Sequence, residues 1–76
     1  MKSISLNKYK KYLKSKNCYK DRTVSSHEIW YSKDIKLTRP IIVDSNYSDV
    51  PVFHIKNTLK LLGISDKDFE KEIRNT

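Results

Sequence analysis

The sequence predicts an α+β fold in which one helix precedes three strands, a second helix and a short extra C-terminal helix. Apolar residues recur at helical spacing before residue 17 and after residue 50, whereas β-branched and aromatic residues dominate much of the segment between them. The three strands are expected to form one antiparallel sheet packed on the helices. Because the 76 residues contain neither a linker nor an internal repeat, residues 1–76 are expected to form a single domain.

A stripe of apolar side chains predicts the first helix at residues 4–16. Lysines occupy much of the remaining surface of this segment. Ser3 or Ser5 suits the N-cap position, and Asn17 suits a left-handed residue at the C-terminal end. The stripe consists of Leu6, Tyr9, Tyr12 and Leu13.

The central segment predicts three strands, at about residues 18–24, 27–32 and 36–43. Pro40 is awkward inside the third strand because proline donates no hydrogen bond to a ladder. Either Pro40 lies at a strand start or bulge, or the third strand is an edge strand. A polar loop is expected at residues 44–49.

The second helix is expected at residues 51–62, since proline suits its first turn and Gly63 suits a left-handed C-terminal cap. Its buried stripe would contain Val52, Ile55, Leu59 and Leu62. Ser65, followed three residues later by Asp68, predicts the start of the third helix. Phe69 and Ile73 would anchor that helix to the core.

The charge is high and unevenly distributed. The net charge is +7, and residues 1–39 carry eleven basic and three acidic side chains whereas residues 40–76 carry five and six. This asymmetry indicates one face for a polyanion, of which nucleic acid is the commonest, or alternatively a solvated basic surface. Cys18 is the only cysteine, which excludes an intrachain disulfide and suits a reducing compartment. No apolar run has signal-peptide or membrane-spanning length, so a cytoplasmic protein without a membrane partner is expected.

Two stretches of the chain carry a resemblance to a known family. Residues 22–30 read Arg-Thr-Val-Ser-Ser-His-Glu-Ile-Trp, and residues 49–64 read Asp-Val-Pro-Val-Phe-His-Ile-Lys-Asn-Thr-Leu-Lys-Leu-Leu-Gly-Ile. Their order and spacing resemble the signatures of the HicA toxins, and the resemblance extends over about residues 5–72. It implies the α-β-β-β-α fold of double-stranded-RNA-binding domains, cleavage of messenger RNA without a metal or cofactor, and inhibition by a HicB-like antitoxin protein.

The sequence departs from the HicA pattern at three places. Ser25 stands where the family usually has a glycine before Ser-His, and its side chain would crowd an RNA backbone. Asp44 stands where many members carry a histidine. Phe53-His54 replaces the usual Gly-Thr near the start of the second helix.

The resemblance implies that His27 is the catalytic residue. RNA cleavage requires a proton to leave the attacking oxygen and another to reach the leaving oxygen, and imidazole performs such transfers near neutral pH. Cationic side chains would bind the phosphate and stabilise developing charge. The RNA-binding candidates are Arg22, Ser26, Lys10, Lys14 and Lys20.

The other chemistry-bearing residues allow more than one interpretation. His54 is either structural or a second acid–base group that faces the same groove as His27. The two histidines, one cysteine and scattered acids show no recognisable metal-ligand spacing, so no metal site is predicted. The aromatic candidates either stack on bases or belong to the core or a partner interface; they are Tyr19, Trp30, Tyr31 and Tyr47.

Three functions compete at this point. The first is an endoribonuclease toxin with a protein antitoxin. The second is a non-catalytic double-stranded-RNA-binding module, which the Asp49–Phe53 segment disfavours because it offers no basic group at the start of the second helix. The third is a protein-interaction module that binds an antitoxin without cleaving RNA.

Overall fold

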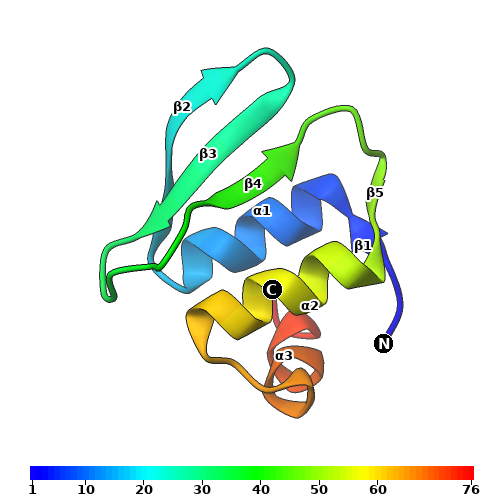
Figure 1. Ribbon diagram of the computed structural model, residues 1–76. Coiled ribbons are helices and arrows are strands. Elements are labelled where there is room, and N and C mark those ends of the chain that lie inside the picture. Colours follow the sequence, from blue (N-terminus) through cyan, green and yellow to red (C-terminus); the bar gives the residue numbers. More distant parts are fainter.

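The computed structural model describes all residues, 1–76, and confirms the α+β class (Figure 1). Three strands form an antiparallel sheet in the order β2-β3-β4, and the helices lie on one side of it. The strands of this sheet are β2 (Cys18–Val24), β3 (His27–Ser32) and β4 (Ile41–Asp44). The helices are α1 (Leu6–Ser15), α2 (Val52–Leu62) and α3 (Asp66–Ile73). None of the three is long and apolar enough to cross a membrane.

The helix ends agree with the caps that the sequence predicts. The Ser5 hydroxyl accepts a hydrogen bond from the Lys8 backbone N–H, and the Ser65 hydroxyl accepts one from Asp68 N–H. Asn17 follows α1 with a φ of 62°, and Gly63 ends α2 with a φ of 70°. Both lie in the left-handed region, where glycine and asparagine are the preferred residues.

The core lies between the sheet and the helices. Its largest fully buried side chains are Trp30, Tyr12, Phe69, Leu13, Ile41 and Ile55. Cys18 is also buried in this cluster, as expected of a small core residue. Because successive side chains of a strand point to opposite faces, the burial of Trp30 directs its neighbours Ile29 and Tyr31 to the face away from the helices.

The third strand begins later than predicted, at Ile41 rather than at residue 36. Pro40 immediately precedes it, so the absent N–H costs the sheet no ladder bond. β4 is also an edge strand, since β3 is its only neighbour in this sheet. Both readings of Pro40 therefore hold, and residues 33–40 form the connection rather than a strand.

A second, two-stranded sheet was not predicted. β1 (Ile4–Ser5) pairs antiparallel with β5 (Asp49–Val50), so the first helix starts at Leu6 and the polar loop ends before Asp49. Two-residue strands are too short for a periodic pattern to reveal them. The pair connects the start of α1 to the chain segment that enters α2 (Figure 1).

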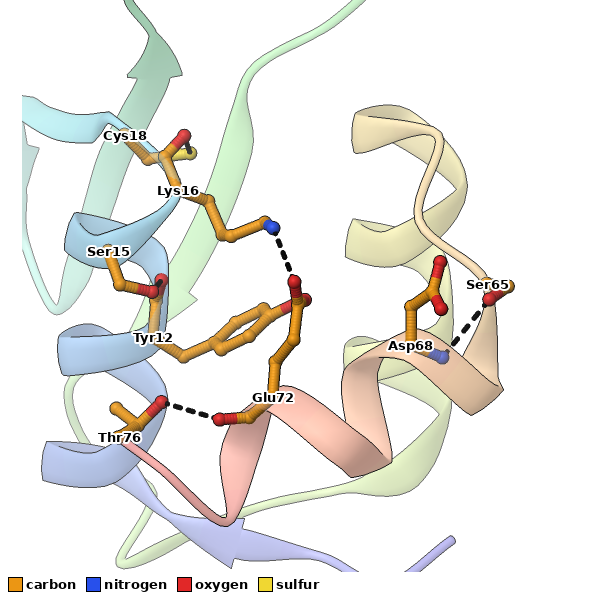
Figure 2. A network of polar contacts seen from close by, with 8 residues as sticks. All are labelled: Tyr12, Ser15, Lys16, Cys18, Ser65, Asp68, Glu72 and Thr76. Atoms are coloured by element: carbon orange, nitrogen blue, oxygen red, sulfur yellow. Dashed lines mark hydrogen bonds and ion pairs between the residues drawn. The ribbon is translucent and has the colours of Figure 1, made fainter.

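A polar network fastens α3 to α1 (Figure 2). The Tyr12 hydroxyl donates to Oε1 of Glu72 at 2.8 Å, and Lys16 Nζ lies 2.9 Å from Oε2 of the same carboxylate. These hydrogen bonds, first from Lys16 and then from Tyr12, lower the pKa of Glu72. The ring of Tyr12 also meets Phe69 edge-on, at 4.9 Å between centroids. The extra C-terminal helix is therefore part of the core and not an appendage.

Candidate functional site

His27 lies at the tip of the β2–β3 hairpin, as the first residue of β3. A two-residue turn, Ser25-Ser26, separates it from its ladder partner Val24. The tip extends beyond the helices (Figure 1), and 53% of the His27 side chain is exposed. The imidazole is therefore accessible to a large ligand.

The turn explains why a glycine suits position 25. Ser25 has a φ of 57°, whereas Ser26 has no positive φ. A positive φ at the first central residue alone is the requirement of a type II′ turn, where glycine is strongly preferred. Ser25 thus adopts a backbone conformation that costs L-residues roughly 1–2 kcal/mol.

Asp44 lies directly opposite His27 on β4. Its Oδ2 is 3.9 Å from Nε2 of His27, which is longer than a hydrogen bond but close enough for an electrostatic contact with a protonated ring. Its other oxygen, Oδ1, accepts a hydrogen bond from the Asn46 N–H at 2.9 Å, which restricts the orientation of the carboxylate. In the sequence, Asp44 stands out only as a departure from the HicA pattern. The register between β3 and β4 is what places it beside His27.

The hairpin tip is also fastened to the chain after β4. The Ser45 backbone N–H and hydroxyl both donate to the Ser26 carbonyl, at 2.8 and 2.9 Å. These bonds extend the β3–β4 pairing by one residue beyond His27 and Asp44. Both residues are therefore held on paired backbone, although they lie close to a turn.

Arg22 shares a sheet face with His27. It lies opposite Ile29, and a register shift between Lys20 and Arg22 places an extra residue, Asp21, in the strand. The Arg22 guanidinium contacts the Asp21 carboxylate at 2.7 Å, and hydrogen bonding to Asp21 and then to Tyr31 raises its pKa. Arg22 remains exposed and is available to a phosphate, since exposed ion pairs contribute little.

The three candidate lysines do not join this group. Lys10 Nζ lies 2.7 Å from Oε2 of Glu28. Glu28 is two residues from the buried Trp30 on β3, so it lies on the helix side of the sheet. Lys20 lies opposite Trp30 on the same side, and Lys14 is exposed one turn after Lys10 on α1. The structure therefore separates Lys10, Lys14 and Lys20 from His27.

Glu28 is a buried polar residue that the sequence did not single out. It is 7% exposed and accepts hydrogen bonds from Lys10 and, at 3.0 Å, from Nε1 of Trp30. Burial alone would raise the pKa of this carboxyl, but these two hydrogen bonds outweigh burial and the pKa is lowered. The only sequence signal is its position two residues before Trp30, which predicts a shared face.

His54 lies in the first turn of α2. Its Nε2 is 3.3 Å from the Tyr47 hydroxyl, and its ring stacks on Phe53 at 4.4 Å between centroids. It lines a shallow groove of about 210 Å³ between β4 and α2, together with Asn57 and Leu61. The contacts with Tyr47 and Phe53 are those expected of a structural histidine, and Asp44 lines a second, smaller pocket beside His54.

Burial and side-chain contacts show where the four aromatic candidates lie. Trp30 is in the core and Tyr47 contacts His54, whereas Tyr19 and Tyr31 lie side by side on the outer sheet face. No three His, Cys, Asp or Glu side chains lie close enough together to hold a metal ion.

Comparison with known proteins identifies no relative, because no family model, no curated protein and no solved structure matches this chain.

Proposed function

We propose that this protein is the toxin component of a type II toxin–antitoxin system, a metal-independent endoribonuclease that cleaves messenger RNA in the cytoplasm. The observation that carries the proposal is the exposed His27, held on paired backbone opposite Asp44, with Arg22 on the same sheet face. The α+β fold, the resemblance of residues 22–30 and 49–64 to HicA proteins, and the net charge of +7 support it.

The proposed chemistry needs one proton acceptor at the attacking oxygen. His27 takes the proton of the RNA 2′-hydroxyl while the 2′-oxygen bonds to phosphorus and the bond from phosphorus to the 5′-oxygen breaks. The 5′-oxygen takes a proton from water, so the products are a 2′,3′-cyclic phosphate and a 5′-hydroxyl. Arg22 stabilises the charge that develops on the phosphate oxygens.

Cleavage of a long RNA in the presence of EDTA tests the proposal. Wild-type protein should cleave, and His27→Ala should lose about 10²–10⁴-fold in rate, the usual contribution of a positioned acid–base group. His54→Ala is the matched control, because it removes the other imidazole and should keep the activity. Abolition of cleavage by EDTA, or equal rates for wild type and His27→Ala, would contradict the proposed mechanism.

The same proposal includes a HicB-like antitoxin that covers the sheet face around His27. Since Arg22 lies on this face, the partner should present an acidic side chain opposite it. Protection of His27 from diethyl pyrocarbonate in the complex, with His54 as the internal reference, is the expected result. Equal modification of His27 in the free and bound protein would place the partner elsewhere.

One observation favours an alternative, a non-catalytic RNA-binding or antitoxin-binding module of the same fold. Ser25 adds a side chain at the turn beside His27, at a position where φ is positive and the family has glycine. The alternative expects RNA or antitoxin binding without cleavage by wild-type protein. Appearance of cleavage in Ser25→Gly would identify the serine as the cause.

A further inference from the structure

The face of the sheet opposite the helices carries two tyrosines at one end and His27 at the other. Tyr19 and Tyr31 are ladder partners on β2 and β3, with ring centroids 6.4 Å apart and an angle of 39° between the rings. Tyr19 follows the buried Cys18 and Tyr31 follows the buried Trp30, so both rings lie on the outer face. Tyr19 is 39% exposed, and no helix covers this face (Figure 1).

The irregularity in β2 determines which charges share that face. Without an extra residue, strict alternation from Tyr19 would direct Asp21 outward and Arg22 towards the helices. The shift between Lys20 and Arg22 reverses the alternation, so Arg22 pairs with Ile29 on the outer face. Arg22 then lies between the tyrosine pair and the hairpin tip along β2.

We propose that Tyr19 and Tyr31 form a base-stacking subsite, so that this face binds single-stranded RNA with a phosphate at His27. The inference rests on the proposed function, because it names the form of RNA that the His27 site accepts. Tyr31 lies four positions after His27 along β3, which is about 13 Å at the rise of a strand. A few nucleotides of single strand bridge this distance, with Arg22 beneath the intervening backbone.

The observations favour a single strand over a duplex. Tyrosine rings stack on bases whose faces are free, and a duplex hides those faces. The N-terminus of α2 starts with Pro51, Val52 and Phe53, which offer a duplex backbone no positive charge. A polyanion is favoured over a second copy of this chain, since two copies that each carry a net charge of +7 repel each other.

Binding by the His27→Ala protein separates this inference from catalysis. The probes are a fluorescein-labelled single-stranded 12-mer RNA and the same strand annealed to its complement, followed by fluorescence anisotropy. The single strand should bind more tightly than the duplex. Tyr19→Leu and Tyr31→Leu should each weaken binding of the single strand about 5- to 100-fold, the usual effect of removing a stacking ring.

Two variants show whether stacking is responsible. Tyr19→Phe keeps the ring and should keep the affinity. Phe53→Leu removes an aromatic ring that is 60% exposed on α2 and should also keep the affinity. If Tyr31→Leu fails to fold, as judged by its thermal melt, the exposed Tyr19 decides the outcome alone.

The outcomes distinguish the two proposals. Tyrosine-dependent binding of the single strand supports the inference even if the wild-type protein cleaves nothing, in which case the catalytic proposal fails alone. Equal binding of duplex and single strand, or tyrosine variants that bind like their parent, overturns the inference and leaves cleavage by His27 intact. Absence of binding to either RNA also overturns it and leaves the face to a protein partner.

Discussion

Replacing Glu28 by glutamine removes the charge from a carboxylate that the fold buries beneath the sheet. The Trp30 hydrogen bond survives, since the glutamine oxygen still accepts it, whereas the 2.7 Å contact with Lys10 loses its ionic character. A hydrogen bond to a charged group contributes about 1.5–3 kcal/mol. Because Lys10 keeps part of its contact with water, we expect the lower half of this range, about 2 kcal/mol.

A loss of this size is easily measured in a domain of 76 residues. It corresponds to a fall in Tm of roughly 8–16 °C, at about 4–8 °C per kcal/mol for a domain of this length. Urea denaturation at pH 7 measures the free energy of unfolding directly. Glu70→Gln is the control: this carboxylate is 48% exposed and makes only a 3.4 Å contact with the N-terminus, so its loss should change stability by less than about 0.5 kcal/mol.

The effect should depend on pH in a defined direction. The folded state lowers the pKa of Glu28 below its usual value of 4.5, so the stabilisation is fully present above pH 4.5. It is lost as the pH falls through the folded pKa, and wild type and Glu28→Gln should converge there. Equal stability of the two proteins at pH 7, or a difference that does not shrink as the pH falls below 4.5, would refute the assignment of the Lys10 contact as stabilising.

Two further substitutions test the turn and the α1–α3 joint. Ser25→Gly should raise the free energy of unfolding by about 1 kcal/mol, because glycine adopts the φ of 57° without steric cost. Urea denaturation measures this free energy. A loss of stability would show that the serine side chain makes a compensating contact. Tyr12→Phe should cost about 1 kcal/mol, because it removes the hydroxyl that donates to Glu72 but keeps the edge-on contact with Phe69. A Tyr12→Phe protein as stable as wild type would mean that Lys16 alone holds the Glu72 carboxylate.

The order of the three helices and of the three strands in the main sheet, together with most helix ends, follows from local physical chemistry and was predicted correctly. Ser5 and Ser65 cap helices because a serine oxygen satisfies backbone N–H groups two or three residues away. Gly63 ends α2 because a residue without a side chain adopts the left-handed conformation of this position at little steric cost. The third strand was placed too early, since β-like residues before Pro40 were counted as strand although the ladder starts only at Ile41.

Tertiary structure alone decided how the candidate site is composed. The sequence singled out His27 and Arg22, but a strand's faces depend on register, and the extra residue at Asp21 reverses them halfway along β2. The partner of His27 is Asp44, seventeen residues away in sequence, because antiparallel pairing places them opposite each other. Lysines of α1 and β2 looked equivalent to Arg22 as charges, yet the sheet separates them from His27, since side chains on opposite faces of a sheet cannot bind the same phosphate.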